Sequence, residues 1–172
     1  NIRCMKRLDA TVGRFCASLL PTPSFAALPS SPKTLLVIRP GGIGDAALLA
    51  PALIGLKRKF PHSHLTVLAE RRNAGVLQLV PEVDAALRYD VLSEFVQVFQ
   101  AGYDVLIDTE QYHRLSAVVG RMVKAGLRIG FATNERERLF NVLIPYSHDD
   151  YEAVSFGHLL VPLGIECSSL PE

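Results

Sequence analysis

The feature that most constrains this fold is a strand, a glycine-rich turn and a helix start that follow one another near residue 40. The apolar run Thr34–Ile38 is rich in branched residues, which favours a buried strand. The turn Arg39–Asp45 holds three glycines, which let the backbone bend sharply and bring N–H groups close to a ligand. These groups lie at the positive end of the next helix dipole. The pattern therefore predicts a binding turn after the first strand.

The alternation of strand and helix continues along the chain. Strands are expected at 34–39, 65–69, 85–89, 103–108, 127–131 and 142–145, and helices at 45–59, 73–80, 91–101, 112–125 and 152–163. Strands and helices that alternate with short turns predict a parallel sheet with helices on both faces, a Rossmann-like α/β fold. Such sheets bind ligands at the carboxyl ends of their strands, near the point where the strand order reverses.

Residues 1–32 precede this alternation and are predicted to form an amphipathic helix and a Pro/Ser-rich linker. The helical segment carries an apolar stripe and basic residues: Leu8, Val12, Phe15, Cys16, Leu19 and Leu20, with Arg3, Lys6, Arg7 and Arg14. Two interpretations of the stripe stay open. Either it packs on the domain or on a partner, or it lies on an anionic membrane surface.

The composition excludes several classes of protein. A chain of 172 residues with 49% hydrophobic residues and net charge +1 is typical of one globular domain and argues against nucleic-acid binding. Cys4, Cys16 and Cys167 form no CxxC pair, so neither a disulfide framework nor a zinc site is expected, and a reducing cytosol fits. No apolar run approaches the ~18 residues of a membrane-spanning helix.

Two kinds of ligand suit the turn. Gly42-x-Gly44-x-x-Ala47 matches a dinucleotide fingerprint, and Glu70 ends the second strand where a ribose-binding acid would lie. The alternative function is therefore an NAD- or NADP-binding domain of an oxidoreductase. However, a pyrophosphate would meet the carboxylate of Asp45, and like charges repel. That carboxylate suits a neutral hydroxyl better, from which it accepts a proton as a general base. In a plainer interpretation Asp45 serves only the helix, as its N-cap or as an acid of its first turn.

Two stretches resemble a known family. The run Leu36–Leu53, in which Gly44-Asp45 is followed by two small residues and Leu-Leu-Ala-Pro-Ala, resembles the opening motif of glycosyltransferase family 9. These are the bacterial ADP-heptose:lipopolysaccharide heptosyltransferases. The run Tyr103–Asp108, followed by a helix and Arg128–Phe131, is similar in order and spacing to a second signature of the family.

The resemblance implies the N-terminal half of a GT-B glycosyltransferase. Residues 33–172 would form a Rossmann-like domain for the acceptor sugar, and a C-terminal domain absent from this chain would hold the ADP-sugar. The implied reaction is inverting transfer of heptose or a similar sugar to a lipopolysaccharide core acceptor, without metal or other cofactor. The implied location is cytoplasmic, at the inner membrane face, with peripheral contact through residues 1–20. We expect an interdomain linker to begin near Glu172 and the single domain to be inactive in transfer.

The resemblance also implies roles for particular residues. Asp45 matches the general base that deprotonates the acceptor hydroxyl, and Arg39 would steady a phosphorylated acceptor or the leaving diphosphate. Gly42 and Gly44 would let the backbone approach the sugar. Other predicted substrate contacts lie at or near the carboxyl ends of later strands: Glu110 and Gln111, with Arg71, Arg72, Arg114, Arg136 and Arg138 as candidates for binding phosphate.

Overall fold

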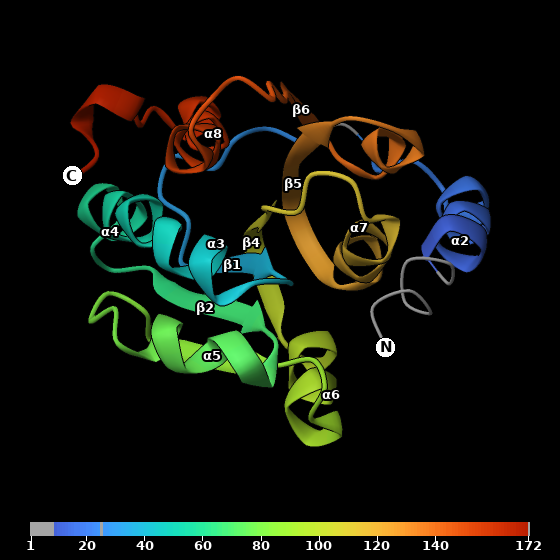
Figure 1. The fold of residues 1–172 in the computed structure, drawn as a ribbon, viewed down its shortest axis with the longest axis horizontal. Helices are drawn as coiled ribbons and strands as arrows, with labels where there is room; N and C mark the ends of the chain where they lie inside the picture. Colours follow the sequence, from blue (N-terminus) through green and yellow to red (C-terminus); the bar gives the residue numbers. More distant parts are fainter. Residues whose placement is uncertain (1–8, 25, 172) are drawn as a thin grey trace.

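One parallel sheet forms the centre of the protein in the computed structural model, which describes residues 9–24 and 26–171. Its six strands lie in the order β3-β2-β1-β4-β5-β6 (Figure 1). The strands are β1 (Thr34–Arg39), β2 (His64–Ala69), β3 (Ala85–Arg88), β4 (Gly102–Asp108), β5 (Lys124–Ala132) and β6 (Val142–Pro145). The predicted Rossmann-like sheet is confirmed, and its strand order reverses between β1 and β4.

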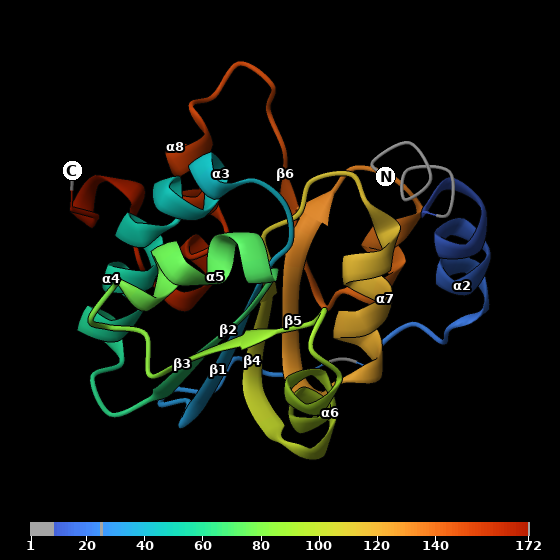
Figure 2. The same ribbon diagram turned by 60° about the horizontal axis from the view of Figure 1, so that its bottom comes forward.

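Helices cover both faces of the sheet (Figure 2). The longer ones are α2 (Arg14–Leu19), α3 (Ile43–Leu48), α4 (Ala50–Lys59), α5 (Arg71–Gln78), α6 (Leu92–Gln100), α7 (Arg114–Met122) and α8 (Glu152–His158). Short helical segments are η1 (Asp9–Gly13), η2 (Glu135–Leu139), η3 (Val161–Leu163) and η4 (Cys167–Ser169). Helices α3, α4, α5 and α8 pack on one face, and α6 and α7 pack on the other.

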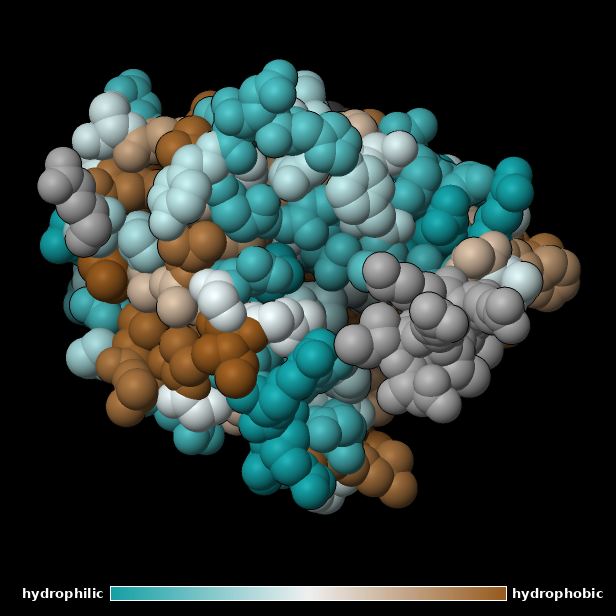
Figure 3. All heavy atoms as spheres, viewed as in Figure 1, coloured by the Kyte–Doolittle hydropathy of each residue, from teal (hydrophilic) through white to brown (hydrophobic). Residues whose placement is uncertain are grey.

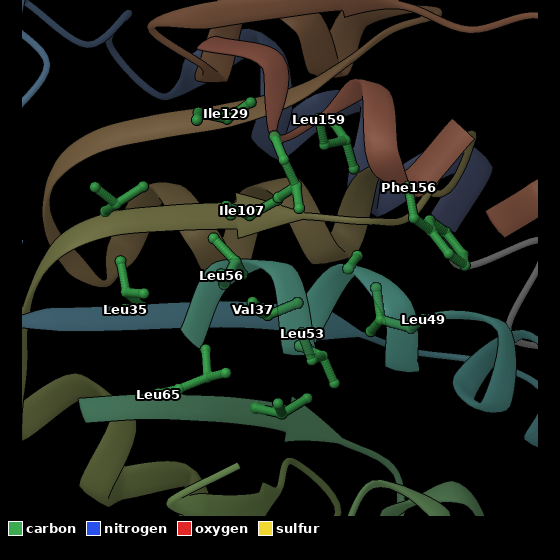
Figure 4. Close-up of a cluster of buried hydrophobic side chains, with 14 of the residues drawn as sticks. Leu35, Val37, Leu49, Leu53, Leu56, Leu65, Ile107, Ile129, Phe156 and Leu159 are labelled. Carbon is green, nitrogen blue, oxygen red and sulfur yellow. The ribbon is translucent and has the colours of Figure 1, made fainter. Parts of the chain in front are cut away.

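The larger hydrophobic core lies between the sheet and the first helix layer. Leu35 and Val37 of β1 and Ile107 of β4 belong to one buried cluster with Leu53 of α4 and Phe156 of α8 (Figure 4). Each is at most 1% exposed, so each contributes about 1.5–3 kcal/mol of transfer free energy. The alternate residues of β1 enter the core on the other face. Because β1 is buried on both faces, its sequence is continuously apolar rather than alternating.

Three helices differ from their predicted bounds in the structure: one is divided in two, and two end earlier. The helix expected at 45–59 is two helices, α3 and α4, because Pro51 has no N–H and instead occupies the first turn of a new helix. The helix expected at 112–125 ends at Met122, and β5 begins at Lys124 rather than at residue 127. There Gly126 allows a close backbone approach, since a Cβ would lie 2.9 Å from the carbonyl oxygen of Asp104. The helix expected at 152–163 ends at His158.

The N-terminal helix is fixed to the domain by its small and polar side chains. Ala17 packs in a cluster with residues of α7 and η2, and the carboxylate of Asp9 accepts a 2.8 Å hydrogen bond from the backbone N–H of Leu115. Cys16 and Leu20 border the same cluster. The segment from Leu20 to Lys33, apart from residue 25, contains neither helix nor strand, as expected for the linker.

The apolar stripe of this helix faces outward. The exposed fractions of Val12, Phe15 and Leu19 are 44%, 64% and 67%. The interpretation in which the stripe packs on the domain is therefore wrong for these three residues, and Leu8 lies outside the described residues. Packing uses the small residues because they let α2 approach α7 closely. In residues 9–24 and 26–171, no helix combines the length and the apolar content that crossing a membrane requires.

Candidate functional site

The turn after β1 is held in place by a side chain from a neighbouring helix. Gly41 has a φ of 107°, a conformation that favours glycine, whereas Gly42 has an ordinary φ of −71° and precedes α3 as its N-cap. Asn73 of α5 is fully buried, and its Nδ2 donates to the carbonyl oxygens of Arg39 (3.2 Å) and Gly41 (3.1 Å). Asn73 is not among the predicted site residues, because only the packing of α5 brings it to the turn.

Arg39 connects the ends of the two central strands. Its guanidinium Nη1 donates to the carbonyl oxygen of Thr109 (3.0 Å), and its Nη2 donates to Oδ2 of Asp45 (2.9 Å). The ring of Phe156 lies 5.3 Å from the guanidinium carbon. The Arg39 side chain is 2% exposed, whereas that of Asp45 is 47% exposed. Arg39 therefore orients the Asp45 carboxylate and leaves it accessible.

Asp45 is the first-turn acid of α3 and not its N-cap. The residue at the N-cap position of α3 is Gly42, and no side-chain cap hydrogen bond is made there. Asp45 lies in the first turn of α3, where the positive end of the helix dipole stabilises a carboxylate. Its side chain binds Arg39 rather than the backbone.

A second carboxylate, that of Glu152, lies beside this pair at the start of α8. Gln111 donates its Nε2 to Glu152 Oε1, and the Tyr146 hydroxyl donates to Oε2 at 3.2 Å. Burial raises the pKa of Glu152 and the Asp45 carboxylate adds to the rise, whereas Tyr146 and Arg39 oppose it. Burial together with Glu152 raises the pKa of Tyr146 to about 12, so its hydroxyl stays protonated at neutral pH. The sequence reading did not include Glu152 or Tyr146 in the site.

Three rings next to Glu152 form what we call the aromatic platform, namely Tyr112, Tyr146 and His148. Tyr112 and His148 stack with ring centroids 5.5 Å apart and planes 17° apart. Tyr146 meets them edge-on at 5.7 Å and 5.4 Å. The platform joins the β4–α7 and β6–α8 connections, and Tyr112 and His148 are 36 residues apart in sequence. Hydrophilic side chains gather over the β6–α8 connection in Figure 3.

Arg136 lies inside the domain and not at its surface. Its side chain and that of Asp108 are both 0% exposed, and Nη2 lies 2.6 Å from Oδ2. Its Nη1 also donates to the carbonyl oxygen of Glu110. Burial raises the pKa of Asp108, and Arg136 is the main charge that opposes this rise. The predicted phosphate contact therefore has no exposed surface in this structure, and Arg136 instead holds the turn after β4.

Glu110 shapes the same turn. Its Oε1 accepts hydrogen bonds from the backbone N–H groups of Gln111 (3.1 Å), Tyr112 (3.2 Å) and His113 (3.3 Å). The Glu110 side chain is 8% exposed. Burial alone would raise its pKa, but the hydrogen bonds and the charge of His113 outweigh burial and lower the pKa to about 2. Glu110 therefore presents Gln111 and Tyr112 outward, while its own carboxylate is used within the protein.

The other arginines predicted to bind phosphate also have protein partners. These contacts are Arg114 with Glu135 (2.7 Å) and Asp9 (3.5 Å), Arg71 with Asp90 (3.8 Å), Arg72 with Glu70, and Arg138 with the carbonyl oxygen of Ser18 (2.9 Å). Glu70, the acid of the nicotinamide alternative, also accepts from the Tyr89 hydroxyl. These ion pairs reduce the net positive charge that the carboxyl ends of the strands present to a ligand.

Two further observations delimit the site. Across residues 9–24 and 26–171, no group of three or more His, Cys, Asp or Glu side chains is placed to hold a metal ion. A hollow of about 560 Å³, lined in part by Tyr103, Arg121 and Lys124, lies at the amino ends of β4 and β5. It is at the opposite edge of the sheet from Asp45, so it is separate from the candidate site.

The strand order and the polar residues at the switch point define a Rossmann-like α/β domain. More narrowly, solved glycosyltransferases contain the same fold. Escherichia coli heptosyltransferase WaaC with ADP matches with a TM-score of 0.68 and 15% identity, over 77% of this chain and 48% of that chain. A glycosyl transferase family 9 protein from Veillonella parvula matches with a TM-score of 0.69 and 19% identity, over 86% of this chain and 45% of that chain.

A third match is E. coli ADP-heptose lps heptosyltransferase II, with a TM-score of 0.65 and 20% identity, over 81% of this chain and 44% of that chain. This chain thus spans less than half the length of each named protein. No protein-family model matches the sequence, and no curated protein matches it. The named structures give no support to the nicotinamide alternative.

Proposed function

We propose that this chain is the acceptor-side domain of an inverting glycosyltransferase. The enzyme would transfer heptose or a similar sugar from an ADP-sugar to a lipopolysaccharide core acceptor. The observation that carries this proposal is an exposed Asp45 carboxylate held by the buried Arg39 at the switch point of the sheet. The shared fold supports it, because WaaC was solved with ADP and with ADP-2-deoxy-2-fluoro heptose.

In the proposed reaction Asp45 accepts the proton of an acceptor hydroxyl. The hydroxyl oxygen attacks the anomeric carbon of the donor, the bond from that carbon to the diphosphate oxygen breaks, and ADP leaves. Arg39 is a positioning residue for Asp45. Beyond its chain neighbours and its own helix backbone, a Cβ atom at Gly44 would meet no atom within 4 Å, so the turn is open there, which supports its role in letting the acceptor approach.

The donor side of the reaction needs a second domain. We propose that residues 33–172 hold only the acceptor, so the isolated domain binds it without transferring sugar. Helix α2 and the linker would then be an N-terminal addition to this domain. The proposed transfer would need no metal ion.

The test is an Asp45→Asn substitution in the full-length enzyme. Removing a general base should lower the rate of transfer by about 10²–10⁴-fold. Because the asparagine oxygen can still accept from Arg39, the domain should stay folded, with a small loss of melting temperature from the weakened ion pair. The matched control is Asp90→Asn, since Asp90 is also a partly exposed aspartate paired with an arginine. Near-normal turnover of the Asp45 variant would reject this proposal.

We further propose that η1 and α2 make a peripheral contact with an anionic membrane surface, at the cytoplasmic face of the inner membrane. The outward-facing Val12, Phe15 and Leu19 support this contact, and the basic residues of the segment add electrostatic attraction. A Phe15→Ser/Leu19→Ser double variant should lose sedimentation with phosphatidylglycerol vesicles. Leu79→Ser is the control, because Leu79, directly after α5, is an 81% exposed leucine. Equal sedimentation of both variants would exclude the contact.

A further inference from the structure

The aromatic platform and the Asp45 carboxylate both lie at the carboxyl ends of the parallel strands, in the connections that follow β1, β4 and β6. Glu152 connects them, since it accepts from Tyr146 and Gln111 and begins α8, which packs against α3, the helix that carries Asp45. The negative charge of Asp45 also contributes to the raised pKa of the Tyr146 hydroxyl. The platform is accessible, because Tyr112 is 40% exposed. Stacked rings, a carboxylate and an amide therefore lie together beside the proposed base.

This combination of groups matches the two kinds of surface on a sugar. The face of a pyranose ring presents C–H groups, which carry partial positive charge and pack against the negative face of an aromatic ring. The rim presents hydroxyls, which donate to carboxylates and exchange hydrogen bonds with amides. Tyr112 provides a ring face, and Glu152 and Gln111 provide the polar partners at its edge.

The charges beside the platform favour an uncharged ligand. A phosphate entering here would meet the carboxylates of Asp45 and Glu152, and like charges at close range repel. Arg39 already binds Asp45, and Arg136 is buried against Asp108. Neither guanidinium is therefore free to compensate a phosphate at this place.

We propose that the platform, with Glu152 and Gln111, is a subsite for an unphosphorylated pyranose ring of the acceptor. The ring stacks on Tyr112, its hydroxyls bind Glu152 and Gln111, and one hydroxyl points toward Asp45. This inference rests on the proposed function. It replaces the phosphorylated acceptor expected from the sequence by a neutral one.

The experiment measures sugar binding by the chain of residues 1–172, without a donor. Two probes are compared by saturation-transfer difference NMR and titration calorimetry, namely methyl α-D-mannopyranoside and mannose 6-phosphate. The neutral glycoside should bind more tightly than the phosphate ester. Tyr112→Ala should weaken its binding about fivefold, the size expected for one aromatic contact, whereas Tyr112→Phe should keep it. Tyr151→Ala is the control, since Tyr151 is a 64% exposed tyrosine outside the platform.

Equal binding by the Tyr112→Ala and unsubstituted chains, at equal melting temperature, overturns the subsite. Tighter binding of mannose 6-phosphate also overturns it. If Tyr112→Ala lowers stability, Gln111→Ala provides a second test with the same expected direction. Loss of transfer in Asp45→Asn with normal sugar binding in Tyr112→Ala would reject the subsite alone. Normal transfer in Asp45→Asn with impaired binding in Tyr112→Ala would reject the proposed function alone.

Discussion

Replacing Arg136 by methionine tests whether this residue serves the fold or a ligand. The substitution leaves the Asp108 carboxylate completely buried without its 2.6 Å partner, and it also leaves the carbonyl oxygen of Glu110 without the Nη1 donor. Breaking a buried ion pair on one side costs about 3–5 kcal/mol. Since burial already raises the pKa of Asp108, this carboxyl would take up a proton, which favours the lower end of that range.

A loss of about 3 kcal/mol lowers the melting temperature of a domain of this size by about 10 °C. Thermal unfolding followed by circular dichroism measures it at pH 7. The Asp108→Asn/Arg136→Met double variant is the control, because it removes the buried charge while keeping an oxygen that accepts from the Glu110 N–H at 3.0 Å. The double variant should recover at least half of the loss. A melting temperature within about 2 °C of the unsubstituted chain, combined with lost sugar binding, would refute the structural role of Arg136.

Three further predictions concern the supports of the site. For Glu110, the folded pKa of about 2 lies below the unfolded value of 4.5, so its stabilisation is complete above pH 4.5 and is lost as the pH falls toward 2. Glu110→Gln should therefore lower the free energy of unfolding at pH 7 by up to about 3 kcal/mol and flatten its acid dependence, as measured by urea unfolding. Gly130→Ala should cost about 1–3 kcal/mol, because its Cβ would overlap the ring of Phe140. Gly75→Ala in α5 is its control and should gain up to about 1 kcal/mol, since nothing lies within 4 Å. Asp9→Ala should cost about 1 kcal/mol and expose the linker to proteases, because the carboxylate that binds the Leu115 N–H is lost; normal protease resistance would contradict this.

The Arg39–Asp45 turn shows how much of the site could be predicted from sequence. The signal for this turn is a short apolar run followed by glycines and a helical pattern. Because these residues are neighbours in sequence, the sequence alone predicts a turn at the carboxyl end of a strand. The structure confirms the fold that this implies. The role of Asp45 as a base stays a prediction, although the structure shows its carboxylate bound by Arg39 and partly exposed.

The arginines show where sequence reasoning fails. An arginine after a strand looks like a phosphate contact, because the sequence does not reveal which carboxylate lies opposite. Arg136 and Asp108 are 28 residues apart, and Arg114 meets Asp9 of the N-terminal segment that precedes the domain. Only the packing of η1 against α7 and of η2 against the end of β4 creates these ion pairs.

By itself, the sequence determined the strand–helix alternation, the parallel sheet and the glycine-rich turn after its first strand. These follow from apolar periodicity and from glycine, which act over a few neighbouring residues. The tertiary structure alone decided the use of the arginines, the outward face of α2 and the assembly of Tyr112, Tyr146, His148 and Glu152 beside Asp45. The physical reason is that these contacts join segments distant in sequence, so their partners are chosen by packing and charge neutralisation in three dimensions.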